Sequence, residues 1–521
     1  TPEDIEQFYK QKQQQRAFAP ITLKLKLTEE EIARFAVDRY RFPGVDVQAT
    51  LIRYYPQGQL LSHVLGYIAR INTQEYTQAE KNNYTANDFI GKSGIEKFYE
   101  KILRGKMGSE QVEMDASGRS VRTYHGTSPV PGNNIYLTID SELSKVAMEA
   151  LGTDKGSLVA IDPNSGEILT IVSNPGYDPN AFVQGISNKD YQVLLKHPDH
   201  PLYNRTIRGQ YPMASTIKPF YATQGLDTGT VDLNFRVYDP GYYRLPGGSH
   251  VYHNWKHSGQ GSVNIFRAII VSNDTFFFTL AHMMGITKMD DILTRYGFGH
   301  LTNIDLPDEL PGLVASPAWK EKARHDRWYP GDTINAGIGQ GFMLTTPVQL
   351  AAGVATIASR GKRYQIHLLK SQVTPDAVQH PEKITSLTPL ILHSTSTWNT
   401  VIDAMKQVIA SPEGTAHHKF GTDTPYVAAA KTGTAQVYSA KSAAQLKSVS
   451  ASKNLRDHSL FIVFAPADKP VIAVAVIVEN NKLLAAHAAR KFLDYYFARL
   501  GMKGTQNVNS DLSNQPEINP E

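Results

Sequence analysis

The sequence predicts an α+β protein in which an antiparallel sheet flanked by helices follows an elongated N-terminal region. Segments rich in branched residues, typical of strands, occur at both ends of the region after residue 134, and helical patterns lie between them. At 521 residues the chain also exceeds what a single hydrophobic core usually serves. Its 41% hydrophobic and 20% charged residues are those of an ordinary globular protein.

The composition excludes several classes of protein. Lys and Arg number 53 and Asp and Glu 49, and a net charge of +4 is too small to indicate a nucleic-acid partner. Without cysteine the chain has no disulfide, thiolate metal site or cysteine nucleophile. The most apolar stretch, Leu460 to Val478, is interrupted by Asp468, Lys469 and Pro470, so we expect no membrane span.

The first region, residues 1–133, is rich in Gln, Lys, Arg and Tyr and is expected to be elongated. A helical pattern covers Glu29 to Ala36. Pro129, Pro131 and Gly132 then interrupt the chain, and we place a domain boundary there.

The second region, residues 134–502, has a clear succession of elements. A strand is expected over Ile135 to Ile139, and a helix capped by Asp140 follows it. Ser157 to Val172 has the pattern of a hairpin around an Asp-Pro-Asn-Ser-Gly turn. The C-terminal part predicts three strands, one over 426–437 and two within 460–478, then a helix over 484–500 and a disordered tail over 503–521.

A serine and a lysine lie three residues apart in Tyr211-Pro-Met-Ala-Ser215-Thr-Ile-Lys218-Pro219. On a helix this spacing puts both side chains on one face, so that a nucleophile and a base can meet. Pro219 fits only if the helix begins close to Ser215, where the dipole stabilises developing negative charge. The alternative is a solvated helix face, since residues 450–453 (Ser-Ala-Ser-Lys) match the same pattern.

Lys431-Thr432-Gly433-Thr434 follows an alanine-rich strand. Such a strand of small residues lets an extended peptide approach closely, while Lys431 or Thr434 meets a carboxylate. The alternative is a basic strand that ends in a turn, and Lys92-Ser-Gly is a similar tripeptide earlier in the chain.

Ser272-Asn273-Asp274 interrupts an otherwise apolar segment. A buried hydroxyl and carboxylate there would need polar partners. The alternative is that Ser272 or Asp274 caps a helix.

In this order the three patterns resemble the signature set of penicillin-binding proteins and serine β-lactamases. Further segments look like class B penicillin-binding proteins, over most of residues 135–500; they are Asn204-Arg205, Gly339 to Leu350 and Lys431 to Gln436. Segments of the first region resemble the pedestal of the elongation-type penicillin-binding protein 2; they are Arg39 to Val45, Tyr54 to Pro56, His63 to Tyr67 and Gly91 to Glu96. The resemblance implies a non-catalytic pedestal over 1–133 and a transpeptidase domain over 134–502.

The resemblance also implies a peptidoglycan D,D-transpeptidase, active in cell elongation, that forms an acyl-enzyme on stem peptides ending in D-Ala-D-Ala. Ser215 would be the nucleophile, Lys218 its base and Ser272 the proton relay to the leaving amine. The N–H groups of Ser215 and Thr434 would form the oxyanion hole. The implied catalytic residues are Ser215, Lys218, Ser272, Asp274 and Lys431, and the implied substrate-binding residues are Thr432, Gly433, Thr434 and Trp255.

Asp274 stands where most members of the family have Asn. Its carboxylate near Lys218 would favour the charged lysine, so we expect Asp274 either to pair elsewhere or to share a proton with Lys218. Ala214 replaces the usual Gly and should affect only the turn before the nucleophile. Trp255 either lines the substrate groove or is a buried aromatic residue.

Some relatives bind zinc before Ser272 with Asp, Asp, His and Cys. The matching positions hold Asp239, Asn254, Gln260 and Asn273, a poor set of zinc ligands, so we predict no metal and no cofactor. A rearranged site using the nearby His253 and His257 is the less favoured alternative.

Stem peptides and β-lactam antibiotics are the expected ligands. The pedestal is expected to bind a SEDS-type glycosyltransferase and other membrane proteins of the elongation complex. Because the chain opens at Thr1 without a signal-like segment, we expect an upstream anchor in the bacterial inner membrane and a periplasmic catalytic domain. The rival functions are a D,D-carboxypeptidase, a β-lactamase or β-lactam sensor, and a scaffold. A β-lactamase or sensor is disfavoured, because neither would need a pedestal and no additional deacylating base is evident in the sequence.

Overall fold

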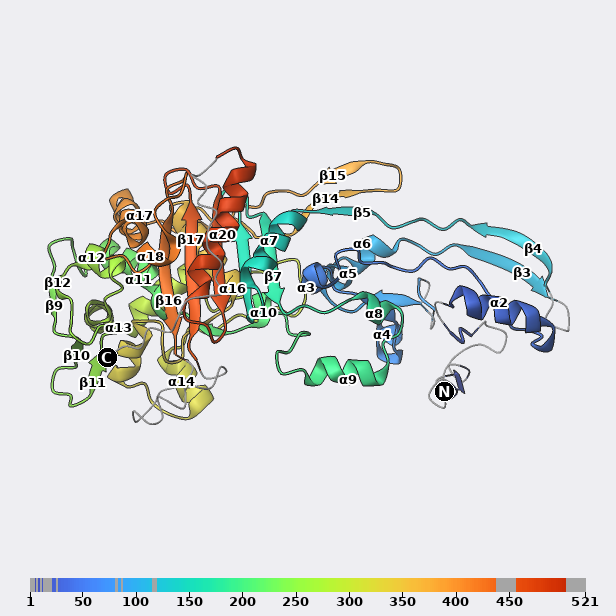
Figure 1. Cartoon of the computed structure of the whole chain (residues 1–521), viewed down its shortest axis with the longest axis horizontal. Coiled ribbons are helices and arrows are strands. Elements are labelled where there is room, and N and C mark those ends of the chain that lie inside the picture. The colour runs from blue at the N-terminus through green and yellow to red at the C-terminus, as the bar shows by residue number, and fades with distance from the viewer. Residues whose placement is uncertain are drawn as a thin grey trace, which may run out of the picture.

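A five-stranded antiparallel sheet forms the centre of the larger domain, at the left of Figure 1. Its strand order is β16-β17-β18-β6-β7, so the two ends of the domain meet where β18 pairs with β6. The strands are β6 (Gly156–Ile161), β7 (Ile168–Asn174), β16 (Ala429–Ala435), β17 (His458–Ala465) and β18 (Ile472–Val478). The predicted hairpin and the three predicted C-terminal strands are confirmed, although β16 is shorter than expected.

The computed structural model describes residues 21–24, 27–79, 83–85, 88–114, 120–436 and 456–502, with the single positions 5, 8, 9 and 12. The tail over 503–521 and the second Ser-X-X-Lys pattern at 450–453 lie outside these ranges. Within them, no helix is both long and apolar enough to cross a membrane.

Helices cover the sheet on both faces. Every residue of β18 is apolar and buried, a pattern that suits a strand with no solvent-facing side. Helices α7 (Ser141–Leu151) and α20 (Leu484–Arg499) pack together against the sheet, and α16 (Pro347–Ala358) contacts β18 and β6. As predicted, Asp140 caps α7, accepting a hydrogen bond from the Leu143 N–H at 3.0 Å.

Further helices belong to this domain. They are α8 (Asn180–Val183), α9 (Asn188–Lys196), α10 (Arg205–Arg208), the 3-10 turn η3 (Ala214–Ile217), α11 (Lys218–Asp227), α12 (Ile265–Ile270), α13 (Asp274–Tyr296), α14 (Pro317–Arg324), α15 (Pro330–Ala336), α17 (Thr395–Ala410) and α18 (His417–Phe420). Three short antiparallel pairs complete the domain: β8 (Tyr211–Pro212) with β13 (Leu344–Thr345), β9 (Val237–Asp239) with β12 (Gly261–Val263), and β10 (Tyr242–Arg244) with β11 (Val251–His253).

The N-terminal region forms an extended arm, at the right of Figure 1, and the predicted two-part α+β organisation is confirmed. Its helix α2 (Glu29–Asp38) starts where Thr28 and Glu31 form a capping box. The arm continues through η1 (Arg39–Arg41), η2 (Gly58–Leu61), α3 (Ser62–Leu65), α4 (Thr73–Gln78), α5 (Gly94–Phe98) and α6 (Glu100–Arg104). Its hairpins pair β1 (Ile68–Arg70) with β2 (Phe89–Gly91), and β3 (Ser109–Met114) with β4 (Ser120–Thr127).

Polar contacts join the arm to the larger domain, and a small sheet starts directly after the arm. The Tyr99 hydroxyl donates to Asp305 Oδ2 at 2.8 Å, and the Tyr55 N–H donates to Asn180 Oδ1 at 2.9 Å. Strand β5 (Asn134–Leu137) pairs with β14 (Leu369–Val373), which pairs with β15 (Gln379–Pro381). Segments more than 200 residues apart in the sequence therefore meet at this junction.

Candidate active site

Ser215 lies in the turn η3, immediately before helix α11. In a 3-10 turn residues i and i+3 eclipse each other, so Ser215 and Lys218 project on one side. Pro219 is tolerated because it falls in the first turn of α11, where its missing N–H has no helical partner. Ala214 has φ 47° and donates its N–H to the Gly339 carbonyl at 2.8 Å, so the turn before Ser215 holds a left-handed residue that is not glycine.

Lys218 is fully buried and holds three oxygen atoms at its Nζ. The ammonium donates to Asp274 Oδ1 at 2.7 Å, to the Ser272 carbonyl at 2.8 Å and to Ser272 Oγ at 3.2 Å. Burial lowers the pKa of Lys218, and the Asp274 carboxylate opposes that shift. Asp274 thus pairs with Lys218 itself, and the expectation that it could pair elsewhere is wrong.

Lys431, on β16, contacts the same hydroxyl. Its Nζ donates to Ser272 Oγ at 2.8 Å and to the Thr432 carbonyl at 3.0 Å. Burial and the neighbouring Lys218 hold the pKa of Lys431 well below its ordinary value. The Ser272 hydroxyl therefore contacts two buried lysines whose protons are both made easier to lose.

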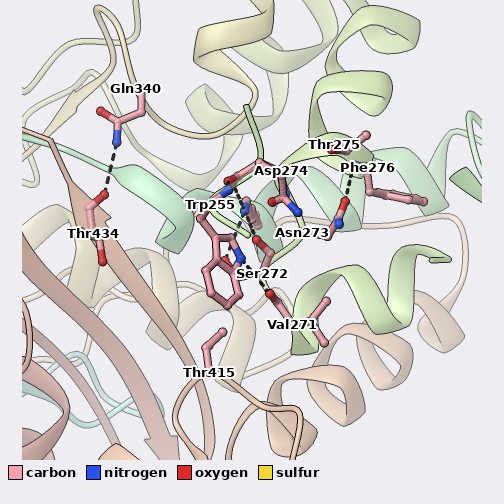
Figure 2. Close-up of polar contacts among 12 residues, drawn as sticks. Trp255, Val271, Ser272, Asn273, Asp274, Thr275, Phe276, Gln340, Thr415 and Thr434 are labelled. Carbon is pink, nitrogen blue, oxygen red and sulfur yellow. Dashed lines mark hydrogen bonds and ion pairs between the residues drawn. The ribbon is translucent and has the colours of Figure 1, made fainter. Parts of the chain in front are cut away.

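The Ser272-Asn273-Asp274 segment both begins a helix and contacts the buried lysines. Asn273 is the N-cap of α13, and its Oδ1 accepts the Phe276 N–H at 2.6 Å (Figure 2). The capping alternative was therefore wrong about Ser272 and Asp274, because the cap is the residue between them. Ser272 has φ 53°, and this turn points its hydroxyl toward the two lysines.

Strand β16 is an edge strand of the sheet and packs on the turn η3 that carries Ser215; among the described residues no strand pairs with its other side. A β-carbon at Gly433 would lie 2.9 Å from Thr216 Cγ2, so only glycine lets β16 pack this closely on η3. Thr434 is exposed, and its carbonyl accepts the Gln340 Nε2 at 3.2 Å (Figure 2). The Thr432 hydroxyl contacts the Thr415 hydroxyl at 2.7 Å, which ties this part of β16 to the segment before α18.

This arrangement coincides with a known family of enzymes. The family model of the penicillin-binding protein transpeptidase domain matches residues 156–494, and that of the penicillin-binding protein dimerisation domain matches residues 1–137. The chain belongs to the penicillin-binding proteins. The suspected resemblance is confirmed.

Known proteins resemble this penicillin-binding protein in sequence and structure over most of its length. The peptidoglycan D,D-transpeptidase MrdA of Acinetobacter baumannii is 42% identical over 95% of this chain and 73% of its own, and that of Escherichia coli is 40% identical over 92% and 76%. Among solved structures, Pseudomonas aeruginosa PBP2 in complex with WCK 5153 has a TM-score of 0.77 at 40% identity, covering 90% of this chain and 95% of that one. The complex of PBP2 and MreC from Helicobacter pylori has a TM-score of 0.80 at 27% identity, covering 95% and 90%.

The predicted site residues of this penicillin-binding protein meet in one place. Direct contacts join Lys218, Ser272, Asp274 and Lys431, while Thr432, Gly433 and Thr434 form the adjacent strand edge. Ser215 neighbours them through η3, but in the part of the chain that the structure describes no hydrogen bond links Ser215 Oγ to Lys218 Nζ.

Trp255 lies over the same site with 56% of its surface exposed, so the buried alternative is wrong. Its backbone N–H donates to Asp274 Oδ2 at 3.0 Å and its indole N–H to the Val271 carbonyl at 3.2 Å (Figure 2). The open ring face suits stacking against a ligand.

Sequence reasoning missed Thr415, and it named Gln340 only as part of the family-like segment Gly339 to Leu350, without a contact; their partners lie 17 and 94 residues away. It named Asp239, Asn254, Gln260 and Asn273 only as a poor set of metal ligands. Among the described residues, no three His, Cys, Asp or Glu side chains group closely enough to hold a metal ion. His253 and His257 lie with ring centroids 5.4 Å apart, and both are exposed.

Proposed function

We propose that this chain is a peptidoglycan D,D-transpeptidase that works through an acyl-enzyme on Ser215. The observation that carries the proposal is the position of Ser272 Oγ, 3.2 Å from Lys218 Nζ and 2.8 Å from Lys431 Nζ. A hydroxyl that contacts both lysines can take up a proton from Lys218 and pass its own proton to the leaving amine. Acyl transfer from a serine needs such a relay, because a proton must leave Ser215 and later reach the leaving amine.

In the first step, Ser215 Oγ attacks the carbonyl carbon between the two terminal D-alanines and its proton passes to the neutral amine of Lys218. Burial lowers the pKa of Lys218, which favours this role, since only the unprotonated amine is a base. The C–N bond then breaks. The leaving D-alanine amine receives its proton through Ser272 Oγ, and Lys431 stabilises the developing charge on that hydroxyl.

The stem peptide adds to the free edge of β16 as an extra strand, pairing with the backbone of the Thr432 to Thr434 segment. The N–H groups of Ser215 and Thr434 hold the tetrahedral oxygen. The Gln340 amide has to leave the Thr434 carbonyl when the substrate N–H takes that acceptor.

In the second step the amine of a neighbouring stem peptide attacks the ester, which forms the cross-link and releases Ser215. A D,D-carboxypeptidase would pass the same acyl group to water. The names of the relatives, peptidoglycan D,D-transpeptidase MrdA, favour the amine. β-Lactam antibiotics acylate Ser215 as mimics of D-Ala-D-Ala.

The N-terminal arm serves as a pedestal over residues 1–133 and docks membrane proteins of the elongation complex, including a SEDS-type glycosyltransferase. The solved complex of PBP2 with MreC, to which the chain is similar, supports a docking role. The catalytic domain then works in the periplasm at the inner membrane.

Intact mass after incubation with benzylpenicillin tests the proposal, with Ser215→Ala beside the unaltered protein. We expect one covalent adduct per chain in the unaltered protein and none in Ser215→Ala. An adduct that survives Ser215→Ala, or no adduct at all, would favour the scaffold function. Product analysis with stem peptides then separates the transpeptidase, which forms dimers, from the carboxypeptidase, which only trims.

A further inference from the structure

One buried carboxylate lies behind the site and has no role in the chemistry above. Asp239 is 1% exposed and accepts five hydrogen bonds. Oδ2 accepts from Asn254 Nδ2 at 2.6 Å, Asn273 Nδ2 at 2.7 Å and the Gln260 N–H at 2.9 Å, and Oδ1 accepts from Thr275 Oγ1 at 2.6 Å and the Gly241 N–H at 2.8 Å. These donors satisfy the buried charge without any cation.

The orientation of the two amides is fixed by their other contacts. Asn254 Oδ1 accepts the Asp274 N–H at 3.0 Å, and Asn273 Oδ1 accepts the Phe276 N–H at 2.6 Å. Because both amide oxygens face backbone donors, both amide nitrogens must face Asp239. Zinc needs nitrogen, sulfur or oxygen lone pairs, and here N–H groups occupy the directions that a cation would need. The residues at these four positions therefore do not fit zinc.

Asp239 and the residues that bind it also fix the position of Asp274. Asn273 and Thr275, the residues on either side of Asp274, both bind Asp239 through their side chains. The loop opposite contributes Asn254, which accepts the Asp274 N–H, and Trp255, whose N–H donates to Asp274 Oδ2. Asp274 Oδ1 is left to bind Lys218.

We propose that Asp239 is a positioning residue for the acylation of Ser215, acting through Asp274 on Lys218, and that its cluster of Asn254, Gln260 and Asn273 works without a metal ion. Removing the carboxylate frees the residues on both sides of Asp274 at once, so Lys218 Nζ loses its alignment. This inference rests on the proposed function, since the affected step is the attack of Ser215.

The metal half of the proposal is tested on the unaltered protein. Zinc content is measured by elemental mass spectrometry, and thermal unfolding and acylation by a fluorescent penicillin are followed with EDTA and with added zinc chloride. We expect no stoichiometric zinc and no change in either measurement. One zinc ion per chain, or loss of stability or rate in EDTA, would overturn it.

The positioning half is tested with Asp239→Asn against Asp305→Asn. Asp305 is a matched control, because it is 7% exposed and accepts from the Leu368 and Leu369 N–H groups and the Tyr99 hydroxyl at the junction with the arm. We expect Asp239→Asn to lower the limiting acylation rate by about 100-fold, because a shift of a catalytic group by about 1 Å usually costs this much. The dissociation constant for the penicillin should stay unchanged. Asp305→Asn should lower the unfolding temperature but acylate at the unaltered rate.

Equal slowing in both variants, or a normal rate in Asp239→Asn, would overturn the positioning role. If Asp239→Asn fails to fold, Asn254→Ala replaces it, since that change removes the acceptor of the Asp274 N–H and leaves Asp239 four other donors. A normal rate in folded Asn254→Ala would count equally against the proposal. Absence of any adduct in the unaltered protein would instead refute the proposed function, and the zinc and stability measurements would still decide the metal half.

Discussion

Gly433 lies against Thr216 so closely that an added β-carbon would stand 2.9 Å from the Thr216 methyl carbon and 3.1 Å from Leu460 Cβ. This contact sets the distance between β16, which carries Thr434, and the turn that carries Ser215. The two proposed donors of the oxyanion hole, the N–H groups of Ser215 and Thr434, come from these two segments. The distance between the donors therefore depends on the absence of a side chain at Gly433.

Gly433→Ala is expected to slow acylation by a fluorescent penicillin by about 100-fold, because the strand has to move and the loss of one oxyanion donor costs this much. Thr216→Ser removes the methyl carbon that the new side chain meets first, and it keeps the hydroxyl. The double variant Thr216→Ser/Gly433→Ala should therefore recover part of the rate. If the double variant recovers no rate, the slow acylation of Gly433→Ala does not come from a changed distance between β16 and η3.

The pH dependence of acylation should report the pair of Lys218 and Asp274. Burial lowers the pKa of Lys218 and the Asp274 carboxylate opposes the shift, so Asp274→Asn should lower that pKa further. Because the base is the unprotonated amine, the acid limb of the rate profile should move to lower pH, even if the plateau falls. Stopped-flow acylation over a range of pH measures this, with Glu413→Gln, an exposed carboxylate bound to Arg267, as the control. An acid limb that stays in place or moves up would contradict the assignment of Lys218 as base.

Glu479→Ala should destabilise the fold strongly, since it leaves a buried cation without its partner. Arg205 is 2% exposed and its Nε donates to Glu479 Oε1 at 2.9 Å, as does the Tyr211 hydroxyl at 2.8 Å. We expect a loss of about 3–5 kcal/mol in the free energy of unfolding, measured in urea. Glu413→Ala breaks the more exposed pair with Arg267 and should cost less than about 1 kcal/mol. Similar losses in both variants would show that burial does not determine the contribution of Glu479.

The sequence predicted the elements and residues whose signal is local. The hairpin of β6 and β7, the cap of α7 and the two ends of the sheet each have a pattern of neighbouring residues that only one structure satisfies. The three chemical motifs were found in the same way, and the family resemblance supplied their roles.

What the sequence could not supply was contact between distant segments. Lys431 meets Ser272 across 159 residues, and Asp239 meets Asn273 and Thr275 across 34 and 36. No spacing along the chain reports such pairs, because tertiary packing creates them. The strands of the arm were also missed, since β3 and β4 expose side chains on both faces and show no alternation of apolar and polar residues.

Acidification should loosen the junction between arm and transpeptidase domain through His63. Its Nε2 contacts the Pro175 carbonyl at 3.3 Å and its ring packs on Tyr177. Burial lowers the pKa of His63 from 6.5 to about 4, and the bond to Pro175 opposes the shift only in part. The unfolded chain therefore takes up a proton more readily than the folded one, so this contribution to stability is complete above pH 6.5 and is lost as the pH falls toward about 4.

Between pH 6.5 and about 4, the free energy of unfolding of the unaltered protein should fall by roughly 2 kcal/mol more than that of His63→Gln. The glutamine keeps a donor for the Pro175 carbonyl but does not titrate. Urea unfolding at several pH values measures the difference. His257→Gln, a substitution of an exposed histidine, is the control. If His63→Gln and the unaltered protein lose stability in parallel, the buried His63 does not link folding to pH, and the acid sensitivity of the junction must come from other groups.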